Sequence, residues 1–356
     1  MDSTPGDALP REDGGRIPSV KRSRWILATV GLVLSAAAVF VLLKQVSARD
    51  LWLNLRRADP GWLLAACLLT TVVYWIRAWR WGEILSPVAR VPGGRLFATT
   101  MVGFLAINTL PARLGELVRA YALARSERIK TGTVLGSVVI ERIFDLAALI
   151  GFWALSLLFA PYPPWFRWSG YLTIALSVTV TAGLWLLHAS HHVPSSFGSR
   201  LKRLLPARLK APVQRPVASF AEGLRVLGKP STVAYAGLLT LVMWIVTGAI
   251  FLVVGQSMKL SLPLWSPLLL SFIVCVAIML PASPGFIGVL EGSCVVGLSL
   301  IGVDTSRALA YGVLYHVTQI LPVIVLGGFY ALWGRVGRVR LEELEQVTVE
   351  APGRKN

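Results

Sequence analysis

Charged side chains in an otherwise apolar part of this chain are spaced in a way that could bind an anion. Asn108, Arg113, Glu116 and Arg119 lie close together. A guanidinium is planar and can donate to two phosphate oxygens at once. A helix that begins nearby would add backbone donors and a partial positive charge. The segment therefore predicts a phosphate-binding site.

A second group of charges follows shortly after, at Glu141, Arg142 and Asp145. On a helix, Glu141 and Asp145 share one face, and Arg142 lies one turn from Asp145. We expect the arginines to hold the phosphate of a lipid headgroup and the carboxylates to keep them in place when the site is empty. Glu291 could serve the second half of the chain in the same way. The predicted binding residues are Asn108, Arg113, Glu116, Arg119, Glu141, Arg142, Asp145 and Glu291.

Two other interpretations of these charges stay open. They could form buried ion pairs that only set the register of packed helices. Arg119 and Glu141 could instead reach the membrane interface along their aliphatic stems. We interpret His316 as a hydrogen-bonded packing residue, with a proton relay as the alternative.

One motif occurs twice in the chain and explains how these charges could lie at membrane depth. Residues 110–116 read LPARLGE and residues 280–285 read LPASPG. Proline removes a backbone donor and glycine loosens the backbone, so each copy should interrupt a helix. Broken helices within a membrane are tolerated only where protein or water satisfies the freed groups. A pair of them in two halves of a membrane protein indicates a transporter's substrate path.

Composition places the chain in a bilayer. It is 55% hydrophobic and 15% charged, with a mean hydropathy of +0.65, whereas a soluble domain carries about a quarter charged residues. Charge-free stretches at 25–43, 171–187, 232–254 and 308–333 are each close to the length of about 20 residues that spans a bilayer. The first is longer than the apolar core of a signal peptide, so we expect it to be a retained helix. We also expect a helix near 61–76 that ends at Arg77 and Arg80 beside Trp75, Trp79 and Trp81 in an interfacial belt, and a helix over about 138–160.

The net charge of +17 is concentrated between the apolar stretches, chiefly at 188–230, which argues against a nucleic-acid partner. By the positive-inside rule this loop and both termini are cytoplasmic, in a multi-pass protein of the plasma membrane. We expect a basic tail over 1–24, a transmembrane domain over 25–335 and a tail over 336–356. The fold class is all-α polytopic, with about six full spans and two broken or re-entrant hairpins. The halves 61–160 and 232–333 would form an inverted repeat, although each hairpin could also be a pair of full spans.

Signals for catalysis and for cofactors are weak. The three cysteines fall in apolar segments and show no metal-ligand spacing, so we expect neither a metal nor a cofactor. The chain shows no Walker-type phosphate loop, Gly-x-Ser-x-Gly elbow or His-Glu-x-x-His motif. The sequence therefore favours a protein that is not an enzyme.

Several runs together resemble the flippase-like transmembrane region of lysylphosphatidylglycerol synthases. They are RAWRW at 77–81, NTLPARLGELVR at 108–119, ERIFD at 141–145 and PASPGFIGVLE at 281–291, and the resemblance covers roughly residues 25–335. It implies movement of a phospholipid or related polar lipid between leaflets. The sequence ends soon after Arg340, so we do not carry over the synthase's aminoacyl-transferase activity.

Two alternatives to lipid transport stay open. The chain could be a membrane-embedded transferase, with Glu116 or Asp145 as general base acting on a lipid-linked substrate. It could also be a non-catalytic partner of a separately encoded lipid-modifying enzyme, docking through its basic loop. The first alternative predicts a change in lipid mass, and the second predicts loss of function on deletion of 195–225.

Overall fold

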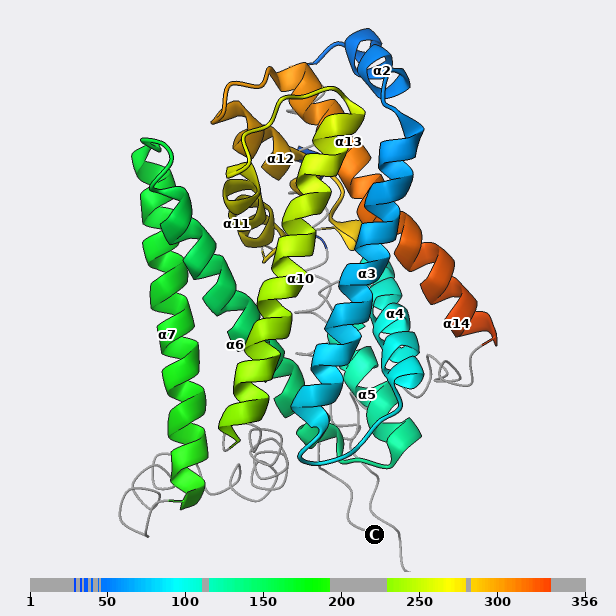
Figure 1. The fold of residues 1–356 in the computed structure, drawn as a ribbon, viewed down its shortest axis with the longest axis vertical. Coiled ribbons are helices and arrows are strands. Elements are labelled where there is room, and N and C mark those ends of the chain that lie inside the picture. The colour runs from blue at the N-terminus through cyan, green and yellow to red at the C-terminus, as the bar shows by residue number, and fades with distance from the viewer. Residues whose placement is uncertain are drawn as a thin grey trace, which may run out of the picture.

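The computed structural model describes residues 46–110, 115–192, 229–279 and 283–333, with scattered positions between 29 and 44; for 177, 180 and 181–192 it describes the backbone alone. Most of the predicted first span, both tails, most of the basic loop and Arg113 lie outside these residues. Every regular element in the described part is a helix (Figure 1). The chain is therefore an all-α polytopic membrane protein.

Among the described residues, three helices are long and apolar enough to cross a bilayer: Pro60–Leu85, Pro230–Ser257 and Thr305–Leu332. The first two are α3 and α10. The third is α13 (Thr305–Pro322), a π-helical turn over Val323–Gly327 and α14 (Gly328–Trp333). The π turn directly follows Pro322, which cannot donate to a regular helix. Before α3, the short helix α2 (Ala48–Arg56) packs against α13.

The helix α3 extends beyond its predicted end. We expected it over 61–76, with Arg77, Arg80 and the tryptophans around them in an interfacial belt. It begins at Pro60, capped by Asp59, and ends only at Leu85. Trp75 and Trp79 are exposed, but Arg80 and Trp81 are fully buried. The interfacial interpretation is therefore wrong for Arg80, because the helix continues past it and turns it toward the protein interior.

The helix α6 (Thr131–Ser156) also begins earlier than predicted. We expected it over about 138–160, which would place Glu141 and Asp145 in its first turns. Its true start at Thr131 moves both carboxylates toward the middle of the helix, where they are buried. Glu141 therefore does not extend to the interface. The helix α7 (Pro164–His192) follows and packs against α6.

Four shorter helices form two hairpins. They are α4 (Gly93–Thr109), α5 (Gly115–Glu127), α11 (Ser266–Met279) and α12 (Val289–Ser299). At 1.5 Å per residue the longest is about 26 Å, less than the roughly 30 Å of a hydrocarbon core. In Figure 1, α4 and α5 lie in the lower half of the molecule and α11 and α12 in the upper half. The hairpins thus enter the helix bundle from opposite ends.

The turn before α12 in the second hairpin meets the end of α4 in the first hairpin. A short 3-10 turn, Pro284–Phe286, precedes α12 and packs against α4. A Cβ atom on Gly285 would lie 3.7 Å from the backbone oxygen of Asn108, and Gly285 has a positive φ of 72°. The order long, short, short, long is the same in α3–α6 and in α10–α13. The number of full spans and the inverted repeat stay predictions.

Candidate functional site

A cavity of about 240 Å³ lies where the two hairpins meet the long helices. Its polar lining comes from distant parts of the chain, and its walls are mainly apolar and aromatic, with Tyr74, Phe104 and Trp244 among them. The charged or hydrogen-bonding side chains in the lining include Arg77, Asn108, Glu116, Arg142, Asp145, His316 and Gln319. The cavity therefore combines ionic groups with an apolar surface between helices that are long enough to cross a bilayer.

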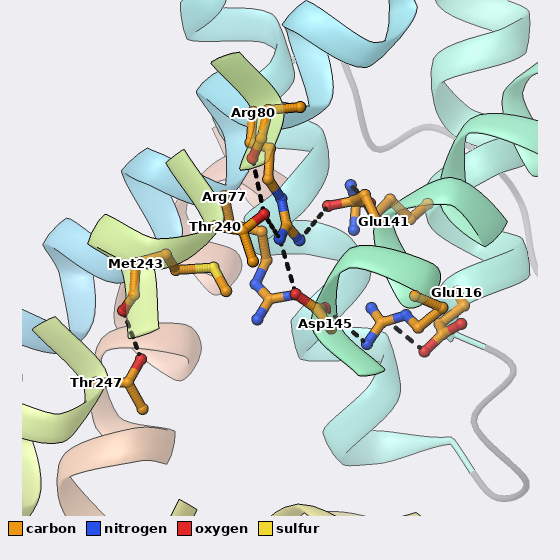
Figure 2. A network of polar contacts seen from close by, with 11 residues as sticks. Arg77, Arg80, Glu116, Glu141, Asp145, Thr240, Met243 and Thr247 are labelled. Atoms are coloured by element: carbon orange, nitrogen blue, oxygen red, sulfur yellow. Dashed lines mark hydrogen bonds and ion pairs between the residues drawn. The ribbon is translucent and has the colours of Figure 1, made fainter. Parts of the chain in front are cut away.

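Asp145 is the point at which the arginines converge. Arg80 donates from Nη1 to Oδ1 over 2.7 Å, and Arg77 donates from Nη1 to Oδ2 over 3.3 Å. Figure 2 shows both guanidiniums directed at this carboxylate from α3. Arg142 Nη1 lies 3.6 Å from the same Oδ2. Asp145 is thus paired with guanidiniums on both of its oxygens, as a buried carboxylate must be paired in a low-dielectric interior.

Glu141 lies one turn before Asp145 and pairs with two arginines. Its Oε1 pairs with Arg80 Nη2 at 3.3 Å and its Oε2 with Arg119 Nη2 at 2.6 Å. Arg119 also stacks over the Trp81 ring, with its Cζ 3.8 Å from the ring centroid. The side chains of Arg80, Arg119 and Glu141 are almost completely shielded from solvent. These residues tie α3, α5 and α6 together and leave little surface for a ligand.

Arg142 differs from the other arginines in its exposure and in its contacts. Its side chain is 34% exposed, and its two ion pairs, to Glu116 Oε1 and to Asp145 Oδ2, are both 3.6 Å long. That distance is too long for a direct hydrogen bond. Four arginines face three carboxylates in the cluster of Arg77, Arg80, Glu116, Arg119, Glu141, Arg142 and Asp145, a formal excess of one positive charge. Arg142 is therefore the guanidinium with most freedom to donate to an anion in the cavity.

The second hairpin contributes a separate acid–base pair. His316 Nδ1 lies 2.6 Å from Glu291 Oε1, and Glu291 Oε2 accepts a hydrogen bond of 2.7 Å from the backbone N–H of Gly288. Glu291 thereby caps the first turn of α12 and at the same time holds α12 to α13. His316 lines the cavity, so the pair stands beside the space that Arg142 also faces.

The structure brings most of the predicted site residues together. Asn108, Glu116, Arg142 and Asp145 line the cavity, whereas Arg119 and Glu141 lie behind it in the buried network. Glu291 does not line the cavity itself but contacts His316, which does. No three His, Cys, Asp or Glu side chains gather as metal ligands would within the described part of the chain.

Sequence reasoning missed the roles of Arg77 and Arg80. Both belong to the RAWRW run that carries the family resemblance, but we placed them at the interface. One signal could have found them, because Glu141 and Asp145 share a helical face in an apolar segment and two buried carboxylates need cationic partners. The arginines that precede them in the chain were the available partners.

Comparison with known proteins shows the family of the chain. The model of the family "lysylphosphatidylglycerol synthase TM region" matches residues 28–327. A UPF0104 membrane protein of Methanothermobacter thermautotrophicus is 25% identical over 86% of this chain and 94% of its own length. A UPF0104 membrane protein of Methanocaldococcus jannaschii is 25% identical over 62% of this chain and 91% of its own. The glycosyltransferase AglD of Haloferax volcanii is 28% identical over 36% of this chain and only 21% of its own length. The chain belongs to the family of the lysylphosphatidylglycerol synthase transmembrane region.

Proposed function

We propose that this protein moves a polar lipid with an anionic headgroup between the leaflets of the plasma membrane, with both of its termini in the cytoplasm. The observation that carries the proposal is the position of Arg142. It is partly exposed in a cavity at membrane depth, inside a cluster with one excess positive charge. An ionisable group in that position is costly and is usually functional.

The arrangement suits a phosphate that must leave water. Arg142 can exchange its long contacts with Glu116 and Asp145 for shorter, charge-assisted bonds to phosphate oxygens. Arg77 lines the same cavity and would add a second donor, since its Nε atom is buried without a hydrogen-bond partner. Glu116 would then hold Arg142 in place when no lipid is bound. The acyl chains would stay in the bilayer while the headgroup crosses.

The two hairpins support a path through the protein. They enter from opposite ends, and Gly285 in the turn of the second hairpin approaches Asn108 near the end of α4 in the first. Transporters with discontinuous helices place their substrate site at such a meeting point. A headgroup in the cavity would contact groups from both hairpins, so movement of either hairpin would change its access to one side of the membrane.

The test is leaflet exchange in liposomes that contain purified protein. Headgroup-labelled phosphatidylglycerol and phosphatidylethanolamine are followed with a membrane-impermeant quencher. We expect fast quenching of the inner pool with the wild type. With Arg142→Ala the rate should be at least roughly tenfold slower, which corresponds to about 1.4 kcal/mol of activation free energy. Quenching no faster than in empty liposomes with either lipid would contradict the proposal.

The second candidate is a membrane-embedded transferase, favoured by the partial similarity to glycosyltransferase AglD. The general base would be Glu116, because both oxygens of Asp145 already pair with arginines. This reading predicts covalent change in a lipid. Lipids extracted after incubation with the protein and candidate donors would differ in mass, whereas a transporter leaves their masses unchanged.

A further inference from the structure

The two hairpins carry matched acid–base contacts. In the first, Glu116 lies in the first turn of α5 and pairs with Arg142 of α6. In the second, Glu291 lies in the first turn of α12 and pairs with His316 of α13. The acid of each pair therefore follows the break, and its base lies on the next long helix.

The match extends to the positions along the chain. Glu291 and His316 are 25 residues apart, and Glu116 and Arg142 are separated by only one residue more. Each base also lies at the same place in its helix, because α6 begins at Thr131 and α13 begins at Thr305. The two pairs thus match in position, and they differ in the basic residue and in the length of the contact, 3.6 Å for Arg142 and 2.6 Å for His316. Arginine keeps its charge at every physiological pH, whereas histidine changes its charge between about pH 5 and pH 8.

We propose that Glu291 and His316 form a proton-sensitive latch that holds the start of α12 to α13, and that a proton bound there controls the transport cycle. The latch deepens the proposed lipid transport and rests on it. When the imidazole is protonated, the contact is an ion pair and the latch is closed. When it is neutral, only a weaker hydrogen bond remains, so α12 can separate from α13 more easily.

The geometry around the latch explains why this one contact matters. A Cβ on Gly312 would lie 3.0 Å from Glu291 Cα and 3.1 Å from Glu291 O, so the backbones of α12 and α13 touch here with no side chain between them. Glu291 also accepts from Gly288, whose φ is 83°. Loss of the His316 contact therefore loosens a cap and a helix contact together.

Among the groups around the latch, we expect His316 to be the one that makes the contact depend on pH. Thiols, phenols and arginines do not change charge in the range where imidazole does. The carboxylates across the cavity each have an arginine partner, and α4 and α10 contribute side chains that do not titrate. The groups near the latch are Cys294 on α12, Tyr311 and Tyr315 on α13, Cys275 on α11, Tyr74 on α3, Asn108 on α4, Trp244 and Thr247 on α10, and across the cavity Arg77, Glu116, Arg142 and Asp145.

The first test measures leaflet exchange at several pH values, equal on both sides of the liposome. We expect the wild-type rate to rise by roughly threefold or more between about pH 5 and pH 8, the range in which histidine side chains in general change charge. His316→Gln can still bond to Glu291 but cannot gain a charge, so its rate should not vary with pH. A flat wild-type profile, a rate that falls with pH, or an unchanged profile in His316→Gln would overturn the latch while lipid transport stands.

The second test measures how accessible the start of α12 is, and it does not depend on transport. Ile287 precedes the capped Gly288 and is 55% exposed. In a chain whose three cysteines are replaced by alanine, Ile287→Cys is labelled with a maleimide at each pH. The labelling rate, divided by that of the same variant carrying His316→Gln, should rise with pH. A constant ratio would overturn the latch. If the wild type moves no lipid but the ratio rises, lipid transport and its control by the latch are both overturned, and only the proton-sensitive contact between α12 and α13 stands.

Discussion

Arg80 of α3 places its Nη1 atom 2.7 Å from Oδ1 of Asp145 on α6, inside the protein. The same guanidinium donates to Thr240 of α10 over 2.9 Å and pairs with Glu141 of α6. One buried side chain thus connects three helices that are far apart in the sequence. This contact explains why the charges of the cluster can exist in an apolar environment.

Replacement of Arg80 should destabilise the protein more than any exposed charge change. Arg80→Ala leaves Asp145 and Glu141 with fewer partners in a buried site, and removal of one member of a buried ion pair costs about 3–5 kcal/mol. Unfolding in detergent, followed by circular dichroism, measures the loss. The matched control is Arg95→Ala, whose side chain is 45% exposed in its pair with Glu127 and should cost about 1 kcal/mol at most. Equal losses in both variants would show that Arg80 is not structural.

The arginines of the cluster should differ in whether their loss mainly slows lipid exchange or mainly lowers stability. Arg142→Ala removes two long contacts of a partly exposed side chain, so it should slow lipid exchange strongly and lower stability by about 1 kcal/mol at most. Arg119→Ala breaks the fully buried pair with Glu141 and should lower stability by about 3–5 kcal/mol. Leaflet exchange and unfolding are measured on both variants. A destabilised Arg142→Ala beside a stable Arg119→Ala would reverse the assignment.

The first hairpin should not tolerate a side chain at Gly115. A Cβ there would lie 2.3 Å from the backbone nitrogen of Ile107 and 2.6 Å from the oxygen of Gly103, so α4 and α5 would have to separate. We expect Gly115→Ala to cost about 1–3 kcal/mol, as overpacking does. Gly151→Ala is the control, because nothing lies within 4 Å of its Cβ position and alanine favours a helix by about 1 kcal/mol. A neutral Gly115→Ala in thermal unfolding would show that the hairpin is not closely packed.

Trp79 and Trp81 of α3 should differ in their contribution to stability, although they are only two residues apart. Trp81 donates from Nε1 to Ser137 Oγ over 3.0 Å and lies under the Arg119 guanidinium. Trp81→Phe loses the hydrogen bond and weakens the cation–π contact, a cost of about 1–2 kcal/mol. Trp79→Phe changes an exposed side chain and should stay within about 0.5 kcal/mol. If both substitutions lowered the free energy of unfolding equally little in chemical unfolding, the buried contacts of Trp81 would not stabilise the protein.

The predicted helices were recovered where the signal was local. Apolar length predicted α10 closely, over 232–254 against Pro230–Ser257. The repeated proline-containing motif predicted interruptions after α4 and after α11, and both helices end there. The ends of α3 and α6 were predicted less well, because charges inside them suggested that each helix stopped or started at the interface.

The sequence by itself determined the class of the protein, an all-helical membrane protein with two interrupted segments and arginines and carboxylates within apolar sequence. Hydropathy, proline and helical spacing are properties of neighbouring residues, so they can be read directly. Only the tertiary structure decided that Arg80 is buried and that Arg142 faces a cavity. That difference depends on Asp145 and Thr240, which lie 65 and 160 residues from Arg80. The free energy of a buried charge is set by partners that helix packing brings close, and that packing is not encoded in any one segment.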